Sequence, residues 1–409
     1  MSLLTLRPRL QVLLPKMSAK NKIEVKKYIG VIITLSLLLA EVLVLSILLA
    51  LRQNEKVSLW FTQTFSKGYA QTFGKFFSLI PFSVFEWAVV LFILGTLAVL
   101  ITIILLLCKK KWKVSLITFL SYACICIFIG TWYLTTAGYA YFRGELPLPQ
   151  REEEYTNAQL VEITNYFFDD FNSLSNKFPR DEKGCVISPY TVKELSLLIA
   201  EEFEKWDTQG YLYPYTPIAK PMVNSWLLSD EGITGITFMP TVECNINVEC
   251  PDVTWAPTIA HELAHAKGVM VENEANMVSA YVLINSNNDF LRYCGYFMRI
   301  GSLRSQMSLV LSEEEWADMH WVNKEISEEY TAYNQFWDEQ ESIFTKIADW
   351  FNDLYLKLSN QSGTDSYQVP PPVVDSTVNP DTGKVEYTIK YSKIQKMFFH
   401  IYHNKVEIA

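Results

Sequence analysis

Two histidines and a glutamate form the part of this sequence best suited to chemistry. His261 and His265 lie four residues apart in the segment His261-Glu-Leu-Ala-His265, and Glu262 follows the first histidine. Residues four apart share one face of a helix, so both imidazoles can reach one metal ion, with Glu262 beside it. The spacing predicts a Zn²⁺ site with His261 and His265 as ligands and Glu262 as the catalytic acid-base group.

A third metal ligand is expected from Glu272 or Glu274, at the start of the next helical pattern. Gly268 precedes them and allows the chain to turn sharply out of the first helix. Glu272 shares a helix face with Asn276, so one of the two can bind metal while the other supports a ligand, whereas Glu274 points ~200° away. We therefore favour Glu272 as the ligand, with Asn276 and Glu274 in supporting positions.

The elements that must position this site are a strand and several helices. Apolar and polar residues alternate over residues 242–250, which predicts a strand whose outer edge can hold an extended peptide. Pro257 then suits the first turn of the helix that carries His261. Apolar residues at helical spacing predict two amphipathic helices upstream, over residues 157–178 and 192–206.

The C-terminal region has its own patterns. Residues 312–358 are acidic, with Trp and Phe side chains at helical spacing, and we expect them to pack into the core. Two runs with strand character, residues 373–378 and 384–390, flank the turn residues 379–383 and predict a small hairpin.

The first third of the chain has the composition of a membrane region. Residues 1–142 hold 15 Lys+Arg against 4 Asp+Glu, a net +11, whereas residues 143–409 hold 20 against 40, a net −20. Apolar runs over residues 28–51, 87–108 and 114–134 are long enough to cross a bilayer. The acidic remainder would be repelled by phosphate, so nucleic acid is not an expected partner.

Basic residues predict the orientation of these spans. They gather before the first span and in the short loop between the second and third, at Arg7, Arg9, Lys16, Lys20, Lys22, Lys26, Lys27, Lys109, Lys110, Lys111 and Lys113. Such loops stay in the cytoplasm, which predicts a cytoplasmic N-terminus and an extracytoplasmic site. Between the first two spans, aromatic residues recur every fourth position at Phe61, Phe65, Tyr69, Phe73 and Phe77. This stripe is typical of a helix at the membrane interface or of one packed under the soluble domain.

Four of the seven cysteines lie beyond the spans: Cys185, Cys244, Cys250 and Cys294. On the predicted strand, Cys244 and Cys250 are separated by roughly 20 Å, and a disulfide needs Cα atoms within about 7 Å. We expect no bridge between them. The sequence has no CxxC pair, so a cysteine-based zinc cluster is not expected either.

Several motifs together resemble a known family. HExxH followed by a helix with Glu272, Ala275 and Asn276 resembles the gluzincin pattern of zinc peptidases, with Asn276 where gluzincins carry Asp. More broadly, the chain is similar to the bacterial domain-of-unknown-function 3810 family of membrane proteins, which are described as HExxH zinc metallopeptidases. The matching segments are 232–235, 258–265, Gly268, 272–276, 292–296, 355–357, 360–361, Gly363 and 366–367.

The resemblance implies a zinc-dependent peptidase acting on peptide or protein substrates, with Glu272 as the third ligand. Tyr293 and Tyr296 lie in a matched segment and are candidate donors to the oxyanion, although aromatic core is an equal reading for both. The alternative class is a pseudo-peptidase with a binding or assembly role. An intramembrane protease is disfavoured, because the segment around His261 lacks the ~18 apolar residues of a span.

The expected fold is mostly α: three transmembrane helices followed by a zincin-like α+β domain with a small sheet. The expected domains are a cytoplasmic N-terminus at 1–27, a membrane domain at 28–142, an extracytoplasmic domain at 143–367 and a C-terminal extension at 368–409. The protein is thus expected to be a multi-pass protein of the cell membrane, with the lipid bilayer as a partner.

Overall fold

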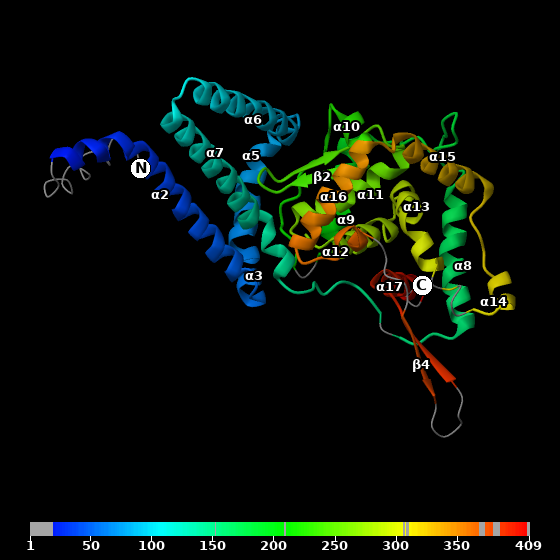
Figure 1. The fold of residues 1–409 in the computed structure, drawn as a ribbon. Helices are drawn as coiled ribbons and strands as arrows, with labels where there is room; N and C mark the ends of the chain where they lie inside the picture. Colours follow the sequence, from blue (N-terminus) through cyan, green and yellow to red (C-terminus); the bar gives the residue numbers. More distant parts are fainter. Residues whose placement is uncertain are drawn as a thin grey trace. The chain divides into compact units, whose positions relative to one another are not determined.

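The structure, a computed structural model, describes residues 19–151, 153–207, 210–305, 307, 311–367, 373–378 and 385–406. This part of the chain is mostly helical and forms two compact units (Figure 1). The membrane unit comprises Met1–Gln53 and Trp87–Leu134, and the site unit comprises Asn54–Glu86 and Thr135–Ala409. The basic residues up to Lys16 and the predicted turn at 379–383 lie outside the described residues.

The membrane unit contains the predicted spans. Its helices are α2 (Ala19–Leu51), α6 (Val84–Cys108) and α7 (Trp112–Tyr133). Three segments are long and apolar enough to cross a bilayer, at Tyr28–Leu51, Val84–Cys108 and Trp112–Gly138. The prediction of three spans is confirmed, and the chain is a membrane protein. A side-chain hydrogen bond joins two of these helices: the hydroxyls of Thr96 on α6 and Tyr122 on α7 lie 2.5 Å apart.

The segment between the first two spans belongs to the site unit and forms one continuous helix, which we call the connecting helix. Its parts are α3 (Glu55–Phe61), η1 (Thr62–Ser66), α4 (Lys67–Tyr69), η2 (Ala70–Gly74) and α5 (Lys75–Ser78). It buries a stripe of small residues, Ser58, Thr62, Ser66, Ala70 and Gly74. The Tyr215 hydroxyl donates to the carbonyl of Gly74 at 2.9 Å, and a Cβ added at Gly74 would lie 2.6 Å from that ring. The connecting helix thus packs against the rest of the site unit through its small residues, whereas Phe65 and Phe73 of the aromatic stripe remain exposed.

A three-stranded sheet lies on one side of the site unit. It consists of β1 (Lys220–Pro221), β2 (Gly235–Phe238) and β3 (Glu243–Ile246), in the order β1-β3-β2. β3 is parallel to β1 and antiparallel to β2, so the strand expected to offer an open edge is central, and that expectation is wrong. β3 is also shorter than predicted, because Asn247 Oδ1 accepts a hydrogen bond from the Glu249 N–H and turns the chain.

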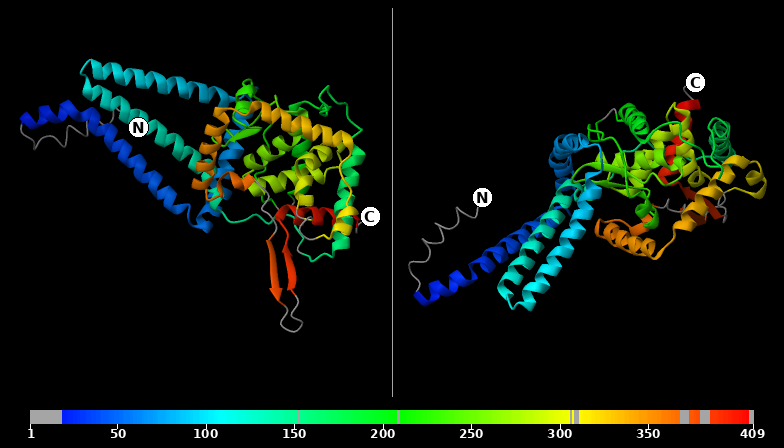
Figure 2. Two further views of the ribbon diagram at one scale, coloured as in Figure 1. Left: turned by 45° about the vertical axis from the view of Figure 1, so that its right-hand side comes forward. Right: turned by 90° about the horizontal axis from the view of Figure 1, so that it is seen from above.

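The helix that carries the HExxH motif lies at the centre of the site unit (Figures 1 and 2). This helix, α11 (Trp255–Ala266), packs on β2 and β3 and is surrounded by α9 (Val192–Trp206), α12 (Glu272–Ile284) and α13 (Asp289–Ser305). α9 has the predicted bounds, since Thr191 and Glu194 form a capping box at its start. The other elements of this part are η3 (Leu134–Gly138), η4 (Ala140–Phe142), α8 (Asn157–Leu174), α10 (Ser225–Asp230) and η5 (Asp252–Thr254).

The C-terminal region continues with helices and a hairpin. Its elements are α14 (Glu313–Ala317), α15 (Lys324–Gln340), α16 (Ile343–Leu358), η7 (Gly363–Tyr367), β4 (Val373–Val378), β5 (Val385–Lys390) and α17 (Lys393–Val406). β4 and β5 pair antiparallel, which confirms the predicted hairpin, and Figure 1 shows it projecting from the unit. The expectation that residues 312–358 pack into the core is wrong for α16, because Trp350 is 60% exposed.

All seven cysteines lie among the described residues and are free. Cys244 is on β3 and Cys250 follows the turn that ends it, so the two are not on one extended strand as expected.

Candidate metal centre

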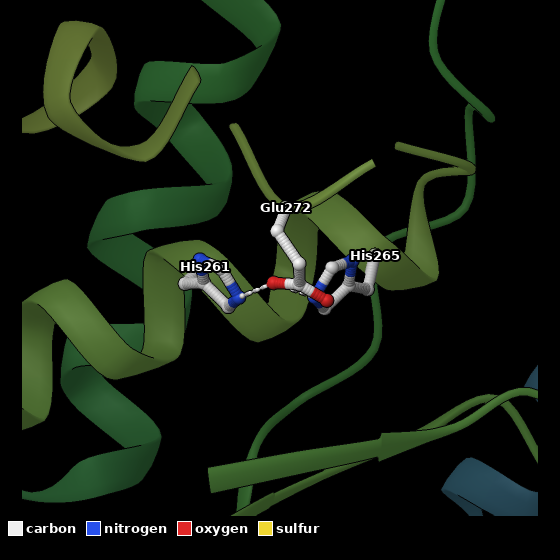
Figure 3. Close-up of side chains that lie close together, drawn as sticks. All are labelled: His261, His265 and Glu272. Carbon is white, nitrogen blue, oxygen red and sulfur yellow. Dashed lines mark ion pairs between the residues drawn. The ribbon is translucent and has the colours of Figure 1, made fainter. Parts of the chain in front are cut away.

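His261, His265 and Glu272 converge from two consecutive helices (Figure 3). The two histidines project from α11, and Glu272 is the first residue of α12. Glu272 Oε2 lies 3.2 Å from His261 Nε2 and 3.6 Å from His265 Nε2, and one ligand atom from each residue lies within 4.8 Å of the others. The three residues are partly or fully buried. Two imidazole nitrogens and one carboxylate oxygen are the kind of atoms that can coordinate a metal ion.

The turn after α11 fixes the orientation of His265. Gly268 has φ +91°, and a Cβ there would lie 2.6 Å from the ring of Tyr213, so both backbone conformation and space require glycine. The turn brings the Val269 carbonyl to 2.7 Å from His265 Nδ1. In the neutral imidazole, a hydrogen bond from Nδ1–H to this carbonyl puts the lone pair on Nε2, the nitrogen nearer to Glu272.

Charge within the cluster opposes the effect of burial. Burial disfavours the charged form of His265, but the carboxylate of Glu272 outweighs it and raises the pKa of His265 to about 9. Burial likewise disfavours ionised Glu272, but the charge on His265 and hydrogen bonds from both histidines lower the pKa of Glu272 to about 2. The carboxylate therefore stays ionised at neutral pH.

Glu262, the glutamate of the HExxH motif, is buried beneath the edge strand β2. Its Oε2 lies 2.7 Å from Thr237 Oγ1, and its backbone carbonyl lies 3.3 Å from Cys244 Sγ. The Thr237 hydroxyl is a donor to this carboxylate, and the sequence alone gave no signal that would pair the two residues.

Gly235 allows β2 to come this close to α11. A Cβ added at Gly235 would lie 2.6 Å from Thr258 Cγ2 and 3.0 Å from Glu262 Cγ. Gly235 and Thr237 are two apart on the strand, so they point to the same face, toward the helix. Because β2 is at the end of the strand order, its outer side is the edge of the sheet next to Glu262.

Glu274 and Asn276, the two residues expected to support the ligands, are used elsewhere. Glu274 accepts a hydrogen bond from the Leu146 N–H at 2.9 Å and forms a buried ion pair with Arg143 at 3.4 Å. Asn276 Oδ1 accepts a hydrogen bond from Arg299 Nη2. The structure thus brings neither residue to a histidine of the cluster, because α12 turns their side chains toward other elements.

The start of α12 is held by a residue that sequence reasoning did not assign to the site. Gln361 Oε1 accepts a hydrogen bond from the backbone N–H of Glu272 at 3.0 Å. Gln361 lies just beyond α16, and the carbonyl of Tyr367 in η7 accepts from Asn276 Nδ2 at 3.4 Å. The residues following α16 therefore wrap around the end of α12 that carries Glu272. In the sequence, only the resemblance of residues 360–361 and 366–367 to the family pattern indicated that this segment matters.

Tyr293 and Tyr296 are core residues of α13 rather than members of the cluster. Both are fully buried. The Tyr293 hydroxyl donates to Glu329 and receives a hydrogen bond from Arg180, while the Tyr296 hydroxyl donates to Asp170 at 2.8 Å. With both hydroxyls bonded to these acids, the expectation that they serve the oxyanion finds no geometric support.

The chain is similar to a known protein family. No curated protein and no solved structure matches the chain. A family model described as "Protein of unknown function (DUF3810)" matches residues 61–371, which include most of the connecting helix, the last two spans and every residue of the cluster. The chain therefore belongs to the DUF3810 family of proteins of unknown function.

Proposed function

We propose that this protein is a membrane-anchored, zinc-dependent metallopeptidase that hydrolyses peptide bonds. The observation that carries the proposal is the convergence of His261, His265 and Glu272 on one point beside Glu262. Two imidazoles and a carboxylate are a common ligand set of catalytic zinc, which keeps a fourth position open for chemistry.

The spacing of the donors suits zinc. Two ligands held at ~2.1 Å by a tetrahedral ion are roughly 3.4 Å apart. The distances of 3.2 and 3.6 Å from Glu272 Oε2 to the two Nε2 atoms bracket that value. Glu272 Oε2 is buried, and apart from its contacts with the two imidazoles it has no hydrogen-bond partner among the described residues. A cation at the centre of the three groups would satisfy it.

Each residue would have a distinct role in hydrolysis. Zinc, when bound, would supply Lewis-acid activation of a water and of the scissile carbonyl. Glu262 would accept the proton of the attacking water and deliver it to the leaving amine. Thr237, 2.7 Å from Glu262 Oε2, would hold the carboxylate in position for both transfers.

The substrate would be an extended peptide or protein segment. β2 is an edge strand, and the side chain of its Thr237 already touches Glu262. Main-chain pairing along this edge would bring a peptide bond to the cluster without requiring a particular side chain.

The proposed location is the extracytoplasmic face of the cell membrane. The basic residues around the spans support a cytoplasmic N-terminus, and three spans would then leave the site unit on the opposite side. Protease added to the outside of intact cells should then digest residues 150–400. Digestion only from the cytoplasmic side would reverse the proposed topology.

Metal analysis and peptide cleavage by the purified full chain test the proposal. We expect about one zinc per chain. Glu262→Gln should keep the zinc and lose cleavage of a peptide library, whereas His265→Ala and Glu272→Ala should lose both. Glu274→Gln is the matched control on α12: Gln can still accept the hydrogen bond from Leu146, so zinc should be retained.

Two results would contradict the proposal in different ways. Full zinc occupancy without any cleavage that depends on Glu262 would favour the pseudo-peptidase alternative. Absence of zinc in a folded wild-type chain, or equal zinc in wild type and Glu272→Ala, would exclude the metal site itself.

A further inference from the structure

α16 turns a continuous apolar face toward solvent. The exposed members lie on one side of the helix: Ile343, Phe344, Ile347, Trp350, Phe351 and Leu354. Their spacing follows the i, i+4, i+7 rule of an amphipathic helix, yet this face is turned outward. Ile343 is 70% exposed and Phe344 is 59% exposed. Soluble proteins rarely leave so many large apolar side chains side by side in water, so the face requires a covering partner.

Two links hold α16 close to the places where the chain leaves the membrane spans. At its N-terminal end, the hydroxyl of Thr345 donates to the carbonyl of Asp230, the last residue of α10, at 2.6 Å. The other end of α10 is fixed by Glu86, which accepts hydrogen bonds from the Asn224 backbone and side chain at 2.7 and 2.6 Å. Glu86 is in the first turn of α6, the second span.

Near its C-terminal end, α16 is linked to the residues that follow the third span. The hydroxyls of Tyr355 and Tyr141 share a hydrogen bond, and their rings pack edge to face at 6.2 Å. Tyr141 lies three residues beyond the end of the third apolar segment at Gly138. Hydrogen bonds thus connect both ends of α16 to residues that adjoin the membrane spans. Those residues must lie at a membrane surface.

Neighbouring elements of the site unit carry the same kind of surface. On α10, Trp226 is 56% exposed, and Leu227 beside it is exposed. On the connecting helix, Trp60 and Phe76 are exposed. This helix joins the first two spans covalently, so it too must lie near the bilayer. Trp and other aromatic side chains are favoured at the boundary between lipid and water.

We infer that α16 lies in the plane of the membrane, with its apolar face inserted into the interfacial region of the same bilayer that holds the spans. The bilayer is the occupant because the site unit is attached to spans at residues 53–54, 86–87 and 134–135, which keeps α16 near lipid. Lys346 and Lys357 on α16 are exposed and form ion pairs with Glu341 and Asp353, so their long side chains lie where headgroups would meet the helix. This inference is independent of the proposed peptidase activity.

Fluorescence quenching of the full chain in lipid nanodiscs tests the inference. Brominated phosphatidylcholine quenches only tryptophans that touch the acyl region, and iodide quenches those in water. Trp350→Phe preserves the apolar surface and removes one fluorophore. We expect this substitution to remove a component that brominated lipid quenches and iodide does not.

Trp321→Phe is the matched control. Trp321 is also exposed, at 44%, and it stacks with Arg304 near α14, which Figures 1 and 2 show at the other end of the site unit from α16. Its removal should leave quenching by brominated lipid unchanged. A Trp350 component quenched by iodide would overturn the inference, because the face would then be in water. A component quenched by neither agent would also overturn it, because protein, such as a second copy of the chain, would then cover the helix.

Discussion

Thr237 Oγ1 lies 2.7 Å from Glu262 Oε2, so the edge strand of the sheet directly contacts the glutamate of the HExxH motif. The same hydroxyl lies 2.8 Å from the backbone carbonyl of Glu262. One threonine therefore connects β2, along which a peptide would lie, to the residue that would move the proton. β2 and α11 are therefore directly linked at this point.

Thr237→Val should slow the proposed hydrolysis without removing zinc. A hydrogen bond to a charged group is worth about 1.5–3 kcal/mol, so we expect a roughly 10- to 100-fold lower kcat. Peptide cleavage and zinc content are the measurements. Thr237→Ser keeps the hydroxyl and should recover most of the activity. Equal kcat values in the Val variant and wild type would show that the hydrogen bond from Thr237 to Glu262 does not contribute to catalysis.

Gly235→Ala should displace β2 from α11. Its Cβ would lie 2.6 Å from Thr258 Cγ2 and 3.0 Å from Glu262 Cγ, contacts that require the strand or helix to move. We expect lower thermal stability and loss of cleavage. Gly68→Ala is the control, because an added Cβ there meets nothing within 4 Å. If Gly235→Ala and Gly68→Ala have the same melting temperature and activity, the close approach of β2 is not required.

Tyr293→Phe and Tyr296→Phe should reduce stability and leave kcat of the stable fraction unchanged. Each removes a hydroxyl that donates to a carboxylate, the buried Glu329 or the partly buried Asp170. A typical loss is about 1–3 kcal/mol for each bond. Thermal unfolding and steady-state kinetics separate the two effects. A large fall in kcat at unchanged stability would restore the idea that one of these tyrosines binds the oxyanion.

The metal-free protein should lose stability as the pH rises from 6.5 to about 9. Glu272 raises the pKa of His265 to about 9 despite burial, above its ordinary value of 6.5. A raised folded-state pKa contributes stability that is fully present below the unfolded value and is lost as the pH rises through the folded value. After chelation, the melting temperature of wild type minus that of Glu272→Gln should therefore shrink across this range. A difference that stays constant with pH would contradict the charge coupling.

The sequence by itself determined the parts of this protein that depend on local pattern. The three spans follow from the length of uninterrupted apolar runs, and Tyr28–Leu51 has the predicted bounds. The capping box of Thr191 and Glu194 begins α9 at the expected residue. The four-residue spacing of His261 and His265 placed both on one face of α11, since helix geometry alone requires it.

Only the tertiary structure decided which elements pack against the face that each sequence pattern predicts. Helix phase favoured Glu272 over Glu274 as the residue beside the histidines, but the ion pair of Glu274 with Arg143 involves a residue 131 positions away in sequence. Alternation predicted a strand at β3 but could not reveal that β1 and β2 flank it on both sides. Periodicity likewise gave α16 an apolar face without stating its direction. A periodic pattern fixes which side chains share a face, whereas burial of that face depends on segments distant in sequence.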